Sequence, residues 1–231
     1  MDESIFTAAE DDEIILCLNY DGLYGINNIN RFLQQSNPNK SIFWGMLEFK
    51  AGDPILFNES ERFAPIIYNN MKGKIIGIEI LDEGQVTERI QFDVLVYTLI
   101  NEDDARWQDF DLLSNNGVDE SQIRFVVNKL KNVDDDEENS LKTELPFQIA
   151  YAVSIHKAQG LEYRSVKIVI TDEVDELITH NIFYTAITRA REKLKIYWTP
   201  EVEQAVLERI KPKDIKKDVG ILRKYINSQT Q

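Results

Sequence analysis

Two short strings in the last third of the chain combine residue types that suit anion chemistry. The first, AVSIHKAQGLEY, occupies residues 152–163, where an apolar run ends at Ser154. Polar and small residues then lead to Gly160, where the chain can turn tightly. Such a loop exposes backbone N–H groups, a hydroxyl and the imidazole of His156 to a phosphate. Glu162, just past the turn, can accept hydrogen bonds from a sugar hydroxyl.

The second string, FYTAITRARE, covers residues 183–192 and contains Arg189. The surrounding segment 179–193 predicts a helix, which places Arg189 and Lys193 on one face and Arg191 on another. A guanidinium held on a helix can clamp a transferring phosphoryl group, an effect worth roughly 10³–10⁵ in rate.

Each of these residues also has a simpler interpretation when it is taken alone. Arg189 is then better explained as a surface ion-pair arginine, and His156 as a hydrogen-bonded structural histidine. The ordered pair of strings favours the chemical interpretation for both.

Other kinds of site are not indicated. The string KGKIIG (72–77) lacks the first glycine and the hydroxyl residue of a phosphate loop. The chain has two histidines and one cysteine, so neither a nucleophilic triad nor a metal site is expected. The acidic run at 134–138 is better explained as a solvated loop than as a metal site, because consecutive carboxylates repel one another.

The elements that must position the two strings are α/β in type. Residues 13–19 predict a short buried strand. A helix is expected over 23–35, where Ile26, Ile29 and Leu33 recur at helical spacing before Asn37-Pro38 ends it. Three more buried strands are predicted from QIAYAVS, SVKIVIT and LKIYWT, and two helices from the segments 201–210 and 214–227.

The middle of the chain has the pattern of antiparallel strands. Short β-branched runs over 47–130 are separated by Gly, Asn and Asp, which predicts a small barrel or meander. One of these runs alternates apolar and polar residues, with Ile90, Phe92, Val94 and Val96 on the apolar side. Trp44, Trp107 and Trp198 could stack on bases, but packing in the core or barrel is the better interpretation.

Composition and charge restrict the class of protein. The chain has 231 residues, 43% of them hydrophobic, which is enough for a core. No membrane-spanning segment or signal peptide is recognised, and the single cysteine fits a cytoplasmic protein. Residues 1–145 hold 12 Lys and Arg against 29 Asp and Glu, whereas residues 146–231 hold 14 against 11. Anion binding is therefore expected in the C-terminal third.

The two strings, in this order and at this separation, resemble helicase motifs V and VI. SIHKAQGLEY is similar to motif V, and YTAITRARE to motif VI, of superfamily 1 helicases of the RecD-like and UvrD-like kind. LNYDGLYGINNINRFLQQSNP (18–38), FKAGDPILFNES and NNMKGKIIGIE resemble the RecD-like segment that runs from motif IV into its inserted barrel. The resemblance covers most of residues 14–200.

The resemblance implies an α/β fold in which residues 14–46 and 146–200 form the second RecA-like motor domain, of the P-loop NTPase type. Residues 47–145 are then a β-rich, Src-homology-3-like barrel insertion. An acidic leader, expected to be frayed, occupies residues 1–13, and a helical tail occupies 201–231.

The resemblance also implies a role for each residue of the two strings. Arg189 is the expected arginine finger, which reaches the γ-phosphate of ATP. Gly160 and Glu162 approach the nucleotide, while Ser154 and His156 contact the backbone of single-stranded DNA. ATP and Mg²⁺ are expected to be bound mainly by an N-terminal RecA-like domain that this sequence lacks. The chain is therefore expected to be a C-terminal piece that is inactive alone.

One departure from the family keeps a second interpretation open. Many relatives have an arginine in motif IV where this sequence has Asp21, and an aspartate cannot neutralise a phosphate. The alternative is a non-catalytic, helicase-like module that binds nucleic acid or protein. A third interpretation keeps the motor and changes its track from DNA to RNA.

Overall fold

The computed structural model describes residues 3–6, 12–58, 61–84, 88–115, 119–129 and 141–210. The predicted loop at 134–138, the predicted helix at 214–227, and residues 1, 2 and 7–11 of the predicted leader lie outside these ranges. No helix among the described residues is both long and apolar enough to cross a membrane.

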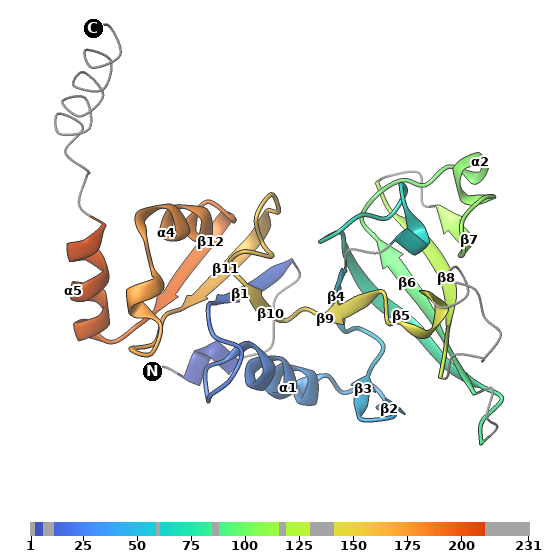
Figure 1. Ribbon diagram of the computed structural model, residues 1–231, viewed down its shortest axis with the longest axis horizontal. Coiled ribbons are helices and arrows are strands. Elements are labelled where there is room, and N and C mark those ends of the chain that lie inside the picture. Colours follow the sequence, from blue (N-terminus) through green and yellow to red (C-terminus); the bar gives the residue numbers. More distant parts are fainter. Residues whose placement is uncertain are drawn as a thin grey trace, which may run out of the picture.

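A four-stranded parallel sheet forms one part of the molecule (Figure 1). Its strands, in spatial order, are β10 (Ala152–Ser154), β1 (Glu13–Cys17), β11 (Tyr163–Val169) and β12 (Ala190–Tyr197). β1 pairs on both edges and is buried on both faces, which explains its continuous apolar run. The predicted buried strand at 13–19 is confirmed.

Helices cover both faces of the parallel sheet. They are α1 (Ile26–Ser36), α4 (His180–Ile187) and α5 (Pro200–Arg209), with short 3₁₀ turns η1 (Glu3–Phe6) and η4 (Asp175–Leu177). α1 packs on the face of β1 that carries Ile15 and Cys17. α4 and α5 pack on the face that carries Ile14 and Leu16. Alternate residues of β1 thus face helices on opposite sides of the sheet, which gives the predicted α/β layers.

The start of α1 depends on a glycine. Gly25 is the N-cap residue, and a Cβ atom there would lie 2.2 Å from the backbone oxygen of Asp21. The backbone N–H groups of Ile26 and Asn27 donate to the carbonyls of Asn19 and Tyr20, so the loop folds back on the first turn of the helix. The predicted helix is confirmed, with its first residue at Ile26.

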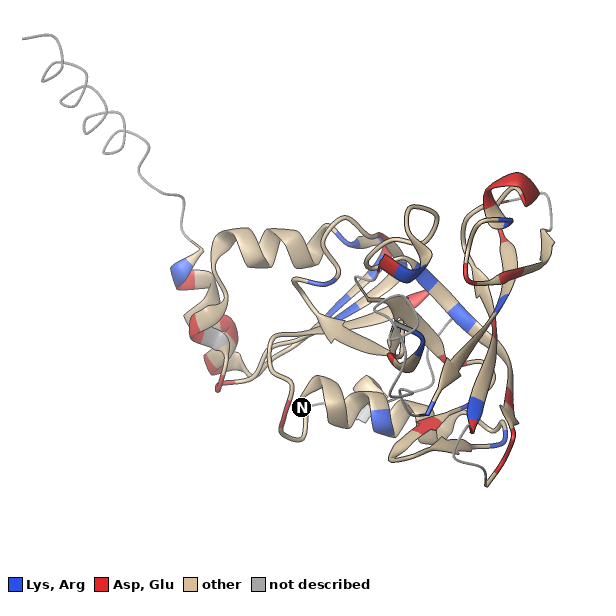
Figure 2. Cartoon of the chain, turned by 45° about the vertical axis from the view of Figure 1, so that its right-hand side comes forward, with Lys and Arg blue, Asp and Glu red and all other residues tan. Residues whose placement is uncertain are grey.

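A six-stranded antiparallel sheet forms the other part of the molecule. Its strands, in spatial order, are β7 (Asp111–Asn115), β8 (Ser121–Asn128), β6 (Arg89–Val96), β5 (Lys72–Leu81), β4 (Pro54–Phe57) and β9 (Phe147–Ile149). Smaller elements are β2 (Ile42–Trp44), β3 (Leu47–Phe49), η2 (Glu61–Phe63), α2 (Glu102–Ala105) and η3 (Leu141–Thr143). Figure 2 shows acidic residues at the far end of this sheet, where α2 lies.

Phenylalanine rings fill the core of the antiparallel sheet. Phe92 of β6 contacts Phe147 of β9 with ring centroids 5.0 Å apart, and Phe49 and Phe125 pack on the same ring. The alternation predicted for β6 is confirmed, because its apolar positions are fully buried and its polar positions are not.

The segment QIAYAVS does not form the single strand predicted for it. β9 ends at Ile149 in the antiparallel sheet and β10 begins at Ala152 in the parallel sheet. Between them, the N–H of Ala150 donates to the carbonyl of Pro54, and the carbonyl of Tyr151 accepts from Ile15 of β1. Two residues therefore carry the chain from one sheet to the other.

The helix predicted over 179–193 ends at Ile187, so Arg189 and Lys193 do not share a helical face. The hydroxyl of Thr188 donates to the carbonyls of Tyr184 and Thr185 and closes the last turn. The chain then enters β12, where Ala190 pairs with Tyr163.

Two further expectations are wrong. Ile5 is fully buried against the α1 face of the parallel sheet, so this part of the leader is packed and not frayed. Trp107 is 88% exposed, because it lies in the turn after α2 and does not pack in the core.

Candidate functional site

The loop 155–162 joins the carboxyl end of β10 to the amino end of β11. Ser154 pairs with Cys17 at the carboxyl end of β1, whereas Tyr163 pairs with Ala190 at the amino ends of β11 and β12. Because all four strands are parallel, the first pair lies at the carboxyl ends of the strands and the second pair at their amino ends. The loop therefore runs along the sheet from the carboxyl ends of the strands to their amino ends.

Internal contacts hold this loop in shape. The N–H of Ala158 donates to the carbonyl of Ser154 at 3.2 Å, and the N–H of Leu161 donates to the carbonyl of Ala158 at 3.1 Å. Ile155 and Ala158 are buried and anchor the loop to the core. Gly160 has a φ of +84°, a conformation that favours glycine, and it is exposed.

Arg189 is fixed between the loop and α4 by three hydrogen bonds. Its Nε donates to the carbonyl of Thr185 at 2.9 Å, its Nη1 to the carbonyl of Leu161 at 2.8 Å, and its Nη2 to the hydroxyl of Thr188 at 3.0 Å. The backbone carbonyl of Arg189 also accepts from the N–H of Tyr163 at 2.8 Å. The side chain is half-buried and has a defined orientation.

The structure separates the predicted site residues into two groups. Glu162 is exposed and lies between Leu161 and Tyr163, the two residues that bond to Arg189. Ser154 and His156 lie instead at the carboxyl ends of the strands. The residues predicted to contact a nucleotide and those predicted to contact DNA therefore lie at opposite ends of one loop.

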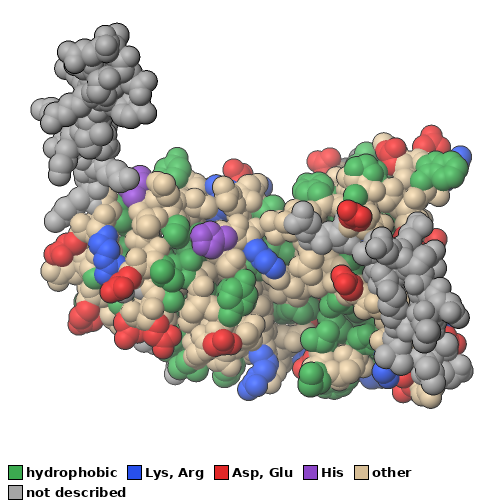
Figure 3. All heavy atoms as spheres, viewed as in Figure 1, with side chains coloured by type: hydrophobic (Ala, Val, Ile, Leu, Met, Phe, Trp, Pro, Cys, Tyr) green, Lys and Arg blue, Asp and Glu red, His purple; other side chains and the backbone are tan. Residues whose placement is uncertain are grey.

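Ser154 and His156, at the carboxyl ends of the strands, differ in accessibility. The Ser154 hydroxyl is nearly buried and accepts a hydrogen bond from the N–H of Lys157 at 3.2 Å. His156 is exposed, and histidine side chains are visible at the surface in Figure 3. Of the two, His156 is the better placed to reach a large ligand.

Asp21 lies in the loop that leaves the carboxyl end of β1. It is exposed, and its Oδ1 accepts a hydrogen bond from Nδ2 of Asn27 at 3.2 Å. A negative charge is thus held beside the start of α1.

Sequence patterns did not identify Asp12 and Arg191 as members of the site. Asp12 accepts hydrogen bonds from Arg191 of β12, from the N–H of Arg164 at 3.0 Å, and from Lys72 of β5 at 2.8 Å. Burial alone would raise the pKa of Asp12, but its hydrogen bond and charge interaction with Lys72, and its bonds to Arg164 and Arg191, lower the pKa below the ordinary value. The sequence signal is the acidic pair Asp12-Glu13, which lies where the predicted leader (1–13) meets the predicted strand (13–19).

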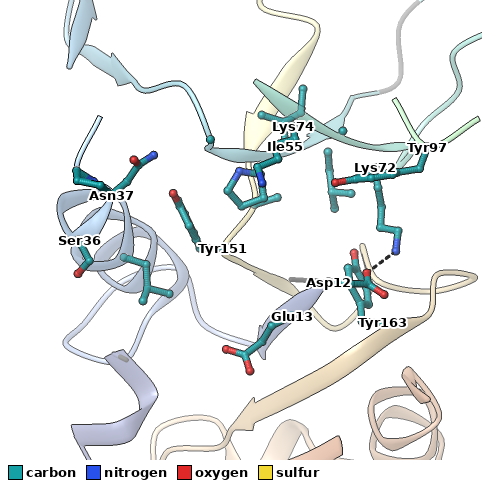
Figure 4. A pocket seen from close by; sticks show the side chains of 17 residues that line it. Asp12, Glu13, Ser36, Asn37, Ile55, Lys72, Lys74, Tyr97, Tyr151 and Tyr163 are labelled. Atoms are coloured by element: carbon teal, nitrogen blue, oxygen red, sulfur yellow. Dashed lines mark hydrogen bonds and ion pairs between the residues drawn. The ribbon is translucent and has the colours of Figure 1, made fainter. Parts of the chain in front are cut away.

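A cavity of about 290 Å³ lies between the two sheets and α1 (Figure 4). Its walls include Asp12, Lys72 and three tyrosines: Tyr97, Tyr151 and Tyr163. None of the five residues predicted to form the site lines this cavity. Across the described ranges, no three potential metal ligands of the His, Cys, Asp or Glu type come together.

Comparison with known proteins gives a family match over the segment that holds both strings. Residues 149–197 match the family of the UvrD-like helicase C-terminal domain. The chain is 22% identical over 193 residues to the RecBCD enzyme subunit RecD of Buchnera aphidicola subsp. Schizaphis graminum, a match that covers 81% of this chain and 25% of that protein. It is 33% identical over 87 residues to the ATP-dependent DNA helicase Pif1 of Campylobacter jejuni, which covers 37% of this chain and 17% of that protein.

Among solved structures, Bacteroides Pif1 bound to ssDNA is similar over 95% of this chain and 47% of that one, with 15% identity and a TM-score of 0.46. The chain spans about a quarter of the length of the RecD relative.

Proposed function

We propose, from the match of residues 149–197 to the UvrD-like helicase C-terminal domain, that the chain is the C-terminal motor region of an ATP-dependent DNA helicase. The parallel sheet with its helices is then the second RecA-like domain, and the antiparallel sheet is the inserted Src-homology-3-like barrel. The RecD and Pif1 relatives support this assignment.

The fixed position of Arg189 is the observation that carries the proposal. A guanidinium has five N–H donors, and three of them are used in the contacts within the described part of the chain. Two donors therefore remain for an anionic ligand, and the arm that carries them is already oriented. Preorganised donors of this kind stabilise charge that develops in a transition state.

The nucleotide is bound chiefly by a first motor domain, which supplies the phosphate loop and the Mg²⁺ ligands. Mg²⁺ bound there neutralises phosphate charge. From this chain, Arg189 approaches the γ-phosphate, and Gly160 and Glu162 lie near the phosphates and the ribose. The chain by itself is expected not to hydrolyse ATP.

Single-stranded DNA is the proposed track, with Ser154 and His156 contacting its backbone. Loop 155–162 connects the carboxyl ends of the strands, where the proposed DNA contacts lie, to the amino ends, where Arg189 lies. It can therefore couple closure of the two motor domains on ATP to movement of the DNA strand. A cytoplasmic location is part of the proposal and fits the single, buried Cys17.

Substitution of Arg189 tests the proposal in the intact helicase that contains this chain. Arg189→Ala is expected to lower DNA-stimulated ATP turnover by roughly 10³-fold or more, while affinity for single-stranded DNA stays within about twofold of normal. Arg31→Ala, which removes an exposed arginine of α1, is the matched control and should leave turnover unchanged. Near-normal turnover in Arg189→Ala would overturn the proposal.

The exposed Asp21 favours one alternative, a helicase-like module that binds nucleic acid or protein without catalysis. A salt titration of binding by the chain alone separates the alternatives for the ligand. Binding to single-stranded nucleic acid should weaken with a log–log slope of about −0.7 per phosphate neutralised. Binding that is indifferent to salt indicates a protein partner, and a preference for RNA over DNA of the same sequence indicates an RNA track.

A further inference from the structure

Lys72 of β5 reaches out of the antiparallel sheet and contacts the parallel-sheet part of the molecule (Figure 4). Its Nζ lies 2.8 Å from Oδ1 of Asp12 and donates to the backbone carbonyl of Glu162 at 2.9 Å. It also lies 4.4 Å from the ring centroid of Tyr163. One side chain thus contacts both the residue before β1 and the end of loop 155–162.

Asp12 receives this contact and connects it to two further elements. Its second carboxylate oxygen accepts from Arg191 of β12 and from the backbone N–H of Arg164 in β11. Its φ is +58°, a conformation that a residue other than glycine adopts at a cost. The surrounding contacts therefore hold Asp12 in a conformation that the backbone alone disfavours.

The peptide group that Lys72 contacts, between Glu162 and Tyr163, also bonds to the backbone of Arg189. Leu161, on one side of Glu162, accepts from the Arg189 side chain, and Tyr163, on the other side, donates to the Arg189 carbonyl. A displacement of the Glu162 carbonyl therefore moves the two contacts that Arg189 makes with the loop. Its contacts with Thr185 and Thr188, at the end of α4, are not moved directly.

Packing between the two sheets is incomplete at this point, although Leu56 of β4 packs in the core of the parallel sheet. The cavity of about 290 Å³ lies between them and is lined by Lys72, Asp12 and Tyr163. The Lys72 and Asp12 side chains are 25% and 29% exposed, so solvent screens their attraction only in part. The polar contacts of Lys72 are thus well placed to determine where the loop sits relative to the antiparallel sheet.

We propose that Lys72 and Asp12 are positioning residues through which the antiparallel sheet controls the orientation of Arg189. The contact is a property of this chain, whereas its effect on ATP turnover rests on the proposed function. When the antiparallel sheet shifts, Lys72 moves the Glu162 peptide and Asp12, and Arg189 moves with them.

Hydrogen exchange of the 231-residue chain tests the physical link. Lys72→Met and Asp12→Asn should each speed exchange at the amides of Tyr163 and Arg164 by about tenfold, while the amide of Ile168 in the middle of β11 stays protected. Lys129→Met is the matched control, because it breaks an ion pair with Glu88 that joins the end of β8 to the start of β6 and does not involve the parallel sheet. Unchanged exchange at Tyr163 and Arg164 in Lys72→Met would overturn the proposal.

ATP turnover of the intact helicase tests the consequence for Arg189. Lys72→Met should lower kcat by between about tenfold and a hundredfold with little change in the KM for ATP, because it misplaces a catalytic group without removing it. Lys72→Arg should restore part of the rate. Faster exchange with unchanged kcat overturns the positioning role, whereas normal turnover in Arg189→Ala overturns the proposed function and leaves the exchange result standing.

Discussion

The hydroxyl of Tyr151 donates a 2.8 Å hydrogen bond to Asp53, and this bond joins the segment between β9 and β10 to the residue that precedes β4. Asp53 is fully buried and also accepts from Gln34 at 2.6 Å and from Asn37 at 2.9 Å, both at the end of α1. Burial, and then the negative charge of Asp53, raises the pKa of Tyr151. A buried carboxylate thus connects α1 to the point where the chain passes between the two sheets.

Replacing this carboxylate should destabilise the chain strongly. Asp53→Ala leaves several buried donors without an acceptor, so the free energy of unfolding should fall by about 3 kcal/mol or more in urea denaturation. Tyr151→Phe removes one donor and keeps the ring, and a loss of about 1–2 kcal/mol is expected. Equal losses for the two variants would contradict the central role of Asp53.

Cys17 should report opening of the parallel sheet. It is fully buried in β1, burial raises the pKa of its thiol to about 12, and the chain has no other cysteine. At pH 8, reaction with a thiol reagent should be at least about a thousandfold slower in the native chain than in urea, because labelling requires β1 to open. The measurement is the labelling rate against urea concentration, and fast labelling of the native chain would show that β1 is accessible.

The contribution of Asp12 to stability should depend on pH. Because its pKa is lowered in the folded chain from the ordinary value of 3.8, its stabilising effect is complete above that value and is lost as the pH falls toward the folded pKa. Asp12→Asn should therefore cost about 1 kcal/mol at pH 7 and almost nothing once Asp12 is protonated in the wild type. Denaturation of both proteins at several pH values gives this difference, and a constant difference would exclude the carboxylate charge as its source.

Two glycines should respond differently to alanine. In Gly25→Ala, the new Cβ meets the Asp21 backbone oxygen at 2.2 Å, so α1 must shift and the loss should exceed about 3 kcal/mol. In Gly160→Ala, no described atom beyond the two neighbouring residues lies within 4 Å of the new Cβ, so the φ of +84° is the main cost, at about 1–2 kcal/mol. Thermal unfolding of both variants compares a steric clash with a conformational cost.

Local patterns in the sequence predicted the elements well, but not how distant residues pair. β6 and α1 were predictable because the spacing of Ile90 and Phe92, or of Ile26 and Ile29, directly reflects which face is buried. The break within QIAYAVS was not predictable, because it depends on pairing with strands far away in the sequence. Because the two halves are equally apolar, the local pattern predicts one strand.

The same limit applies to the site. The motif predicts a role for Arg189, but the end of α4 depends on side-chain bonds from Thr188 and Arg189 to helix carbonyls. Lys72 is separated from Asp12 and from Glu162 by long stretches of chain, so no local spacing connects them.

The placement of β1 has a consequence for the order in which the chain can fold during synthesis. β1 lies between β10 and β11, so its residues find no sheet partner until residues 152–169 have left the ribosome. The antiparallel sheet, in contrast, draws all its strands from residues 54–149 and can form first. Its pairing of β4 with β9 brings Pro54 and Ala150 together, which shortens the loop that β1 and β10 must close and lowers the entropy lost in closing it.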